Sequence, residues 1–488
     1  MNIDFIRRFP SYIMLSLPLF FNEFSSMYID RFLTEYDESL TGEMNIDPLG
    51  QLVIWSSWGQ AIFHSRITSI ANDVRQYTLN LLHHSVIREI IRDDAVQTAG
   101  AMKIRYPKKQ AREFIAASLI HLENIYIYSM LAAEQGDVTL AGVQGINKAR
   151  AKWHTSDNNP QLIFGHSKES ELLTNQLALG TNGRYKSPMV SMGFFTTSYD
   201  YELPDNKSVW EVAEAFIQQV PALRELRTAA LAYLKPLIVE VSKDALTPFF
   251  SAIPDVLKSA YISAFRNPKH VGNYSQAFWL GRTGLNKNGA GAIYQVLKRE
   301  REYPEQFPLP VSGVFNEARK NADRMAEMDE GERRTLDYII EAEPFLTLAD
   351  LMFAGLRRQS QQTLDDFAQF WKQCGLTEQS LPQLSSQLTQ NADLVASLSG
   401  TPGKRFRQLL ELASYPSLEE QVRGLLNYHK ELMEVRGQFP WLALEGDILS
   451  LQTSPVIIDR ERKSGDWVNH YYIPQFRNLL DGLWGDKT

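Results

Sequence analysis

Apolar residues recur at helical spacing along most of this chain. One series steps by three and four positions through Ile67, Ile70, Val74, Tyr77 and Leu81, and another runs through Ile115, Leu119, Leu122, Tyr126 and Met130. This spacing places apolar side chains on one face of an α-helix, where a surrounding core buries them. Segments with the alternation typical of β-strands are few. The pattern therefore predicts a mainly α, multi-helical protein.

Pairs of polar residues mark where some of these helices are expected to begin. In a capping box, a side chain at the helix start and another three positions later satisfy backbone N–H groups that the helix leaves unpaired. The spacing occurs at Ser208 with Glu211, at Ser417 with Glu420 and, in a weaker form, at Thr347 with Asp350. We therefore expect helices to start near residues 208, 347 and 417.

Three regions differ in how densely helical patterns and polar, glycine-containing loops occur along them. The length of 488 residues favours two or three domains. Residues 1–135 are interpreted as an N-terminal helical domain. Residues 136–313 are interpreted as a loop-rich, mainly helical middle domain that carries basic and aromatic segments. Residues 314–488 are interpreted as a C-terminal helical domain. Long polar loops are expected in the middle domain at 154–165, 180–207 and 266–291.

The C-terminal residues change in character. Short segments rich in β-branched and aromatic residues, separated by turn residues, occur at Trp441–Leu451, Pro455–Arg462 and Trp467–Ile473. They predict a small antiparallel β-meander over residues 441–473. A helix from Pro474 to about Leu483 is expected to close the domain.

An apolar run from Tyr12 to Phe21 follows Arg7 and Arg8, as in a signal peptide. The run contains Pro18 and is too short to span a membrane, because a spanning helix needs about 20 apolar residues. No small-residue cleavage site follows it, and no other stretch of the chain is expected to be long enough to cross a membrane. The run instead predicts a buried first helix, whose apolar positions continue at Met27, Ile29, Phe32 and Leu33.

The overall composition is that of a globular protein, with 44% hydrophobic residues, 22% charged residues and a net charge of −7. This balance excludes collagen, coiled-coil rods and disordered polymers. The negative charge argues against a protein that coats nucleic acid or membranes with its whole surface. The single cysteine, Cys374, excludes an internal disulfide and thiolate-rich zinc sites. We therefore expect a soluble, cytoplasmic protein without membrane contact.

A basic and aromatic segment in the middle region is the most suggestive chemical feature. Residues 265–301 hold seven basic residues against one acid. The glycines of 281–291 precede a predicted helix, and glycines at a helix N-terminus favour anion binding. Four aromatic side chains are available to stack on bases, namely Tyr274, Phe278, Trp279 and Tyr294. The acidic stretch 323–350, with nine acids against three bases, offers the alternative that the two segments neutralise each other.

Basic residues from several regions together form the candidate nucleic-acid or anion-binding set. If they converge on one face, they form a groove that follows a phosphate backbone. If they are spread over the surface, they are ordinary solubilising charge. The candidates are Lys103, Arg105, Lys108, Lys109, Lys148, Arg150, Lys152, Arg184, Lys186, Arg266, Lys269, Arg282 and Lys287.

One set of residues has the composition of a metal-dependent nuclease. Glu461 and Lys463 lie two positions apart on a predicted strand, so their side chains point to the same side. Asp447 lies near them if its segment pairs antiparallel to theirs. Carboxylates beside a lysine hold a divalent metal and activate water. In the structural alternative, these charges are a solvent-exposed approach to a turn, and the sequence otherwise predicts no metal and no cofactor.

Three functions remain open, because no motif is specific enough to identify a family. The first is a non-catalytic helical subunit or adaptor of a larger complex, which binds other protein subunits and contacts nucleic acid through the middle region. The second is a metal-dependent phosphodiester hydrolase that uses the C-terminal β segment. The third is a purely structural subunit that has protein partners only. We favour the first, and catalysis by groups distant in sequence stays open.

Overall fold

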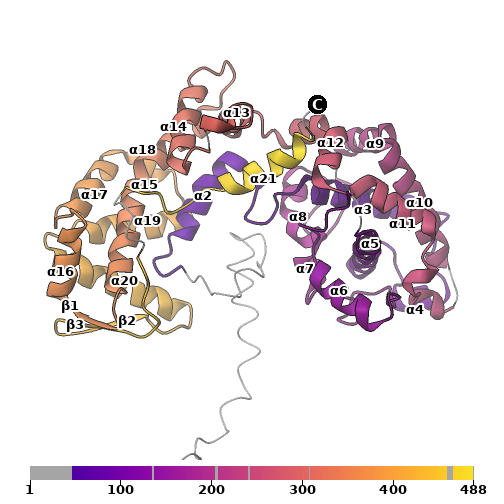
Figure 1. The fold of residues 1–488 in the computed structure, drawn as a ribbon, viewed down its shortest axis with the longest axis horizontal. Helices are drawn as coiled ribbons and strands as arrows, with labels where there is room; N and C mark the ends of the chain where they lie inside the picture. The colour runs from indigo at the N-terminus through magenta and orange to yellow at the C-terminus, as the bar shows by residue number, and fades with distance from the viewer. Residues whose placement is uncertain are drawn as a thin grey trace, which may run out of the picture.

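The computed structural model describes residues 47–134, 137–203, 207–239, 242–306, 308–458 and 465–486. The first helix expected within residues 12–33 lies outside this part of the chain. Helices dominate the described residues, which confirms a mainly α, multi-helical fold. Figure 1 shows two lobes, one built from α3–α12 and the other from α15–α20, with α2 and α21 between them.

The first lobe surrounds α5, which lies at its centre (Figure 1). Helix α5 packs against α11, and α3 packs against α10, so segments before and after residue 135 share one hydrophobic core. Two 3-10 turns, Asp244–Leu246 and Phe250–Ala252, lie between α10 and α11. The helices of this lobe are α3 (Val74–Arg92), α4 (Gly100–Arg105), α5 (Arg112–Ala132), α6 (Ile146–Thr155), α7 (Gln176–Leu179), α8 (Thr181–Ser191), α9 (Lys207–Gln219), α10 (Pro221–Val239), α11 (Asp255–Phe265) and α12 (Pro268–Thr283).

The second lobe is built on the 27-residue helix α15, which packs against α16 and α17. Helices α13 (Asn288–Glu302) and α14 (Val311–Ala322), separated by the 3-10 turn Pro304–Gln306, cover its top in Figure 1. Its elements are α15 (Glu330–Leu356), β1 (Gln361–Thr363), α16 (Leu364–Gln373), α17 (Ser380–Gln390), α18 (Ala392–Ala396), α19 (Gly400–Ala413), α20 (Leu418–Val435), β2 (Leu442–Glu445) and β3 (Ile448–Leu451).

Capping residues explain where several helices begin. The capping box at the start of α20 is confirmed, because the Ser417 side chain accepts from the Glu420 N–H and the Glu420 carboxylate accepts from the Ser417 N–H. Asp73 caps α3 by accepting a hydrogen bond from the N–H of Arg75. The helix start expected at Thr347 is wrong. Helix α15 continues through this residue, whose buried side chain faces the core.

An antiparallel sheet of three short strands, in the order β1-β3-β2, lies in the second lobe. A small antiparallel sheet near the C-terminus is thus confirmed, but its strands differ from those expected. Trp441–Leu451 contains two strands, because Gly446 adopts a φ of 60° in a tight turn between β2 and β3. The third strand is β1, and the described residues 455–458 and 465–472 form no strand. The expected closing helix is α21 (Ile473–Leu483).

Two of the three loops expected in the middle region contain helices. Helices α12 and α13 occupy most of 266–291, and α8 occupies Thr181–Ser191 within 180–207. In α8, burial of Tyr185 and Met189 against neighbouring elements outweighs the low helix propensity of Gly183. The third expected loop, 154–165, contains the end of α6 and then an extended connection. There the Leu162 N–H donates to the carbonyl of Pro248 at 2.8 Å.

Helix α5 corrects the expectation that no further stretch is long enough to cross a membrane. Its 21 residues include a window with a mean hydropathy of 1.3, so by length and composition it is the one described helix that fits a span. The whole window is buried inside the protein. A central helix contacts protein on all sides, and its composition is then apolar all round.

Helices α2 (Leu52–Phe63) and α21 connect the two lobes. Helix α2 packs against α15 and α19, whereas α21 packs against α12 and α3. The two helices meet where the rings of Phe63 and Phe476 lie with their centroids 5.3 Å apart. Helix α21 approaches α12 so closely that a Cβ on Gly272 would overlap the carbonyl oxygen of Gly482. The contact between α12 and α21 therefore requires glycine at position 272.

Replacing Gly272 by alanine is expected to destabilise the protein by about 2–3 kcal/mol, because a backbone carbonyl cannot rotate away as a side chain can. Gly281→Ala is the matched control. It lies in the same helix, where an added methyl group would have no atom within 4 Å, and it should stabilise by about 0.5–1 kcal/mol through helix propensity. Thermal melting of both variants tests this, and equal shifts would contradict the close packing.

Candidate functional site

The first group of predicted cations lies at one corner of the first lobe. Residues 100–112 run beside 164–168, because Arg105 Nη1 donates to the carbonyl of Phe164 at 3.3 Å and Tyr106 Oη lies 3.1 Å from His166 Nδ1. Lys109 is buried, and its Nζ donates to the backbone carbonyl of Ile90 at 3.0 Å. Lys109 therefore stabilises the fold and does not face solvent.

Four exposed cations remain at this corner, and we call them the cationic corner: Lys103, Lys108, Arg112 and Lys168. None of the four makes an ion pair or side-chain hydrogen bond with another described residue. Their charges are therefore directed to solvent. The first three come from the predicted region around Tyr106-Pro107, and Lys168 joins them only through the fold.

A second predicted group, on α6, lies far from the cationic corner. Trp153 of α6 stacks on Tyr128 near the end of α5, with ring centroids 5.8 Å apart, whereas Phe164 contacts Phe114 near the start of α5. Fourteen residues of helix separate these contacts, which corresponds to about 21 Å. Arg150 pairs with Glu134, and Lys148 and Lys152 are exposed. The structure does not bring these two groups together.

Arg184 and Lys186 project from α8 and are held by the protein itself. The Nε of Arg184 donates to the carbonyl of Leu179 at 2.7 Å, and the Nζ of Lys186 lies 4.3 Å from the centre of the Tyr199 ring. Both side chains are half-buried. They therefore contribute to the packing around α8.

The cations of the 265–301 segment pair largely with acids and carbonyls from other parts of the chain. Arg266 lies 3.0 Å from Asp137, and Lys269 lies 3.8 Å from Asp481. Farther along, Arg299 pairs with Glu317, and Arg301 donates to the Gly485 carbonyl. Arg282 is half-buried and Lys287 is exposed at the N-cap of α13. These four partners all lie outside the acidic stretch 323–350.

Of the aromatic side chains of this segment, Trp279 belongs to the core, and Tyr274, Phe278 and Tyr294 are half-buried and pack against it. Trp279 is 2% exposed, and its indole N–H donates to the hydroxyl of Thr78 at 2.8 Å. Phe278 stacks on Phe216 with ring centroids 4.2 Å apart, and the Tyr274 hydroxyl donates to a backbone carbonyl. Rings engaged in this way are not available for stacking on bases.

The N-terminus of α13, where the glycine pattern predicted anion binding, holds an anion of the protein itself. The Gly289 N–H donates to Oε2 of Glu332 at 2.9 Å, and the other oxygen of Glu332 lies 2.9 Å from His64 Nε2. A carboxylate here is favoured by the unpaired N–H groups and the dipole of the helix. Glu332 belongs to the acidic stretch 323–350, but it contacts a backbone N–H of the 265–301 segment and forms no ion pair with that segment's basic side chains.

The nuclease candidates are placed only in part. Asp447 lies in the turn between β2 and β3, with its side chain 78% exposed and 3.4 Å from Arg423 Nη2. Glu461 and Lys463 lie outside the described residues. Among the described residues, no group of three His, Cys, Asp or Glu side chains could hold a metal ion.

Three buried histidines are part of the core of the first lobe. Burial lowers the pKa of His83, His84 and His121 to about 3, so all three rings are neutral at pH 7. His121 bonds the hydroxyl of Tyr233 at 2.8 Å, and His83 bonds that of Tyr261 at 2.9 Å. His121 is completely buried, and its Nδ1 has no hydrogen-bond partner among the described residues.

One buried carboxylate, that of Glu343, joins three parts of the chain. Its Oε2 accepts from the Trp55 indole N–H at 2.8 Å and from the Tyr471 hydroxyl at 2.7 Å. Its Oε1 accepts from the N–H groups of Val468 and Asn469 at 3.1 and 3.2 Å. Burial raises the pKa of Glu343 to about 6, although these hydrogen bonds oppose the rise.

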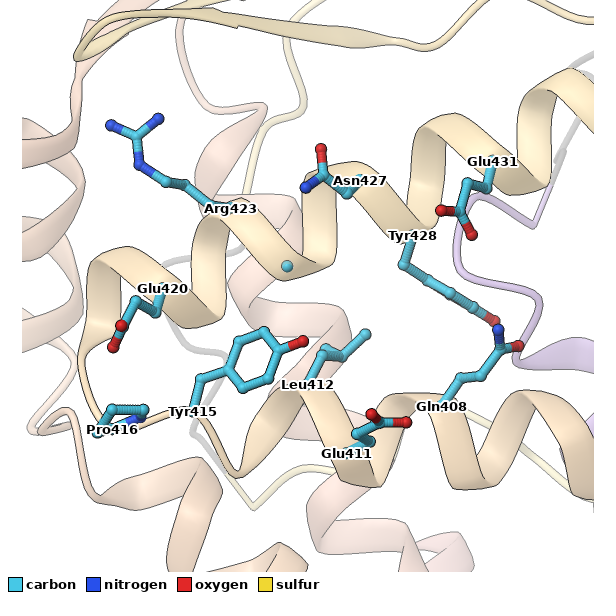
Figure 2. Close-up of a pocket in the computed structure, with 11 residues that line it drawn as sticks. Gln408, Glu411, Leu412, Tyr415, Pro416, Glu420, Arg423, Asn427, Tyr428 and Glu431 are labelled. Atoms are coloured by element: carbon cyan, nitrogen blue, oxygen red, sulfur yellow. The ribbon is translucent and has the colours of Figure 1, made fainter.

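A groove between the antiparallel helices α19 and α20 is a further candidate site. It has a volume of 590 Å³ and is lined by Glu411 and Leu412 of α19, by Tyr415 of the connection that follows, and by Glu420, Asn427 and Glu431 of α20. Figure 2 shows the ring of Tyr415 lying across the space between the two helices. This close approach is possible because position 424 is glycine: a Cβ there would lie 2.7 Å from Cε2 of Tyr415.

The rim of the groove is acidic. Glu411, Glu420 and Glu431 are exposed, and the one lining cation, Arg423, points away from the space between the helices in Figure 2. Arg423 Nε lies 2.8 Å from the carboxylate of Glu419, outside the groove. The groove thus combines an apolar floor at Leu412 and Tyr415 with three exposed carboxylates, of which that of Glu420 also accepts the capping hydrogen bonds of Ser417.

Comparison of the chain with protein-family models, with curated proteins and with solved structures finds no match. The functional interpretation therefore rests on the geometry of the groove and of the cationic corner. The sequence hypotheses did not include the groove. The sequence feature that could have indicated it is the spacing of Glu420, Asn427 and Glu431, which places three polar side chains on one face of α20.

The raised pKa of Glu343 predicts that the stability of the protein depends on pH. Its pKa is raised in the folded protein from 4.5 to about 6, so its contribution to stability is fully present below pH 4.5 and is lost as the pH rises through 6. The difference in unfolding free energy between the wild type and Glu343→Gln, which does not titrate, should therefore change by about 2 kcal/mol in favour of the wild type between pH 7 and pH 4.5. Urea unfolding followed by tryptophan fluorescence measures this difference, and a difference independent of pH would contradict it.

Proposed function

We propose that this protein is a non-catalytic helical adaptor that binds a partner protein in the groove between α19 and α20. The observation that carries the proposal is the combination of an apolar floor with an acidic rim whose three carboxylates form no ion pair with a cation of the described residues. Exposed sites of this kind suit a basic segment that also carries an apolar anchor.

The dimensions of the groove favour a short segment. Glu420 and Glu431 are eleven positions apart on α20, which corresponds to about 16 Å along the helix. A partner helix of three turns has the same length. Its basic residues would meet Glu411, Glu420 and Glu431, and an apolar side chain would lie on Leu412 and Tyr415.

A non-catalytic role is favoured by the positions of the side chains whose pKa is shifted. Burial raises the pKa of the carboxyl groups of Asp47, Asp73, Glu123 and Glu343, and none of these four lines the groove. Among the described residues that line it, the one group with a shifted pKa is the Tyr428 hydroxyl, whose pKa burial raises. Enzyme active sites usually gather such groups in a cleft. Catalysis by the C-terminal set of Asp447, Glu461 and Lys463 remains the alternative hypothesis.

Nucleic acid is a second candidate partner, and the cationic corner favours it. Lys103, Lys108, Arg112 and Lys168 are exposed and directed to solvent, as phosphate-binding side chains are. The proposal is limited to contacts with phosphates, because the aromatic rings of the 265–301 segment are packed in or against the core. Affinity at such a site depends strongly on salt.

Charge reversal tests the groove. A fluorescent twelve-residue amphipathic peptide of lysine and leucine should bind the full chain, and Glu411→Lys with Glu431→Lys should weaken binding at least about tenfold. Glu434→Lys is the control, because Glu434 lies on α20 beside Lys430 and does not line the groove. Fluorescence anisotropy gives the dissociation constants, and equal affinity for all three proteins would refute the assignment.

Filter binding of RNA and DNA at low and high salt tests the second candidate. Replacing Lys103 and Lys108 by alanine should weaken binding equally for all sequences and lower the salt dependence by about one unit of slope per lost phosphate contact. Lys430→Ala, in the other lobe, should leave binding unchanged. The nucleic-acid proposal fails if the wild type does not bind at low salt.

A further inference from the structure

The described chain begins beside the C-terminal end of α20. The carbonyl oxygen of Asp47 accepts a hydrogen bond from Arg436 Nη1 at 2.6 Å, and that of Leu49 accepts one from the Tyr428 hydroxyl at 2.9 Å. These bonds fix the position from which residues 1–46 extend. Arg436 follows α20 directly, so the preceding chain starts at this end of the second lobe.

The same end of the lobe exposes large apolar side chains. Phe439 lies two positions before Trp441, and Trp441 is covered by the guanidinium of Arg357 at 4.3 Å. The carbonyl of Arg357 in turn accepts from the N–H of Val456, which brings the 455–458 segment alongside. Three strongly exposed apolar residues lie on the segments that approach Trp441 in this way, namely Val435 at 77% at the end of α20, Phe439 at 91% and Ile457 at 95%, and we call them the apolar surface. Neighbouring apolar side chains exposed to this degree mark a contact site.

We propose that residues 12–33 of the same chain pack on the apolar surface. These residues include the run from Tyr12 to Phe21, and they are the segment predicted from the sequence to be a buried first helix. Residues 34–46 connect them to Asp47. Thirteen residues span up to about 43 Å when extended, and Val435 is the neighbour of the arginine that binds Asp47. The connection is therefore long enough.

Charge favours the same placement. Residues 34–46 carry four acids and no base. Where they join the described chain, Arg405 and Arg436 both lie near Asp47, and Arg405 also donates to the carbonyl of Gly50 at 3.4 Å. Burial lowers the pKa of Arg436, the carboxylate of Asp47 raises it, and repulsion from Arg405 lowers it. Two arginines thus share the single carboxylate of Asp47, so additional negative charge is favoured beside them. The acidic connection is thus attracted to the end of α20.

Attachment to the same chain also favours this occupant over a second copy. A segment tethered by a short connection has an effective concentration of about a millimolar. A second copy would compete at its actual concentration, which is micromolar in a usual preparation. The tethered segment therefore occupies the surface first.

Cross-linking of the full chain tests the proposal. In a Cys374→Ser background, Leu17→Cys combined with Phe439→Cys should give an intramolecular product with a short bismaleimide. Leu17→Cys combined with Ile104→Cys, which lies exposed in the first lobe, should not. A product that joins two chains, or equal yields for both pairs, would overturn the proposal.

Hydrogen exchange on the full chain provides an independent readout. Removing residues 1–46 should accelerate amide exchange in 435–441 at least about tenfold, because a docked segment protects the backbone beneath it. Phe439→Ser should likewise accelerate exchange in 12–33, whereas Ile104→Ser should not. Unchanged exchange in 435–441 after the truncation would show that something other than this segment, or nothing, covers the surface.

Discussion

The connection between the lobes depends on how the protein solvates the carboxylate of Glu343. This group lies in the core on α15, and burial without partners would be prohibitive for a charge. Donors from α2 and from the C-terminal segment supply the missing solvation, namely Trp55, Val468, Asn469 and Tyr471. Each donor left unpaired in the core would cost about 1–3 kcal/mol. The carboxylate and its donors therefore hold α2, α15 and the segment before α21 in one arrangement, on which the docking of α21 against α12 depends.

Pairing of charges within the protein also limits what the surface offers to ligands. Glu332 occupies the N-terminus of α13, and Asp137 and Asp481 neutralise Arg266 and Lys269. Positive charge directed to solvent is concentrated instead at the cationic corner, and negative charge at the groove between α19 and α20. These two places lie in different lobes (Figure 1). An adaptor with one polar contact region in each lobe is consistent with this distribution.

The site could be predicted from the sequence only in part, for a physical reason that particular residues make clear. Lys103 and Lys108 were among the candidates because their charge is visible in the sequence, and local surroundings leave them exposed. Lys109 directly follows Lys108, yet its side chain is buried, and its Nζ donates to the carbonyls of Ile90 and Asp93. The glycines of 281–291 suggested a loop, yet packing makes most of that region helical. Partners distant in the chain decided each of these outcomes.

By itself, the sequence determined the helical class and the capping box at Ser417, because periodicity and capping act within a few neighbouring residues. Tertiary structure alone decided that Gln361–Thr363 pairs with β3, that Glu343 joins three segments and that α19 and α20 leave a groove between them. Ile67 and Ile70 show where the information in the local sequence ends and tertiary contacts take over. Both are buried as their pattern predicted, but Asp73 starts the helix only after them. Burial follows from apolar character, whereas the partner that each buried or charged group meets depends on contacts that no local pattern encodes.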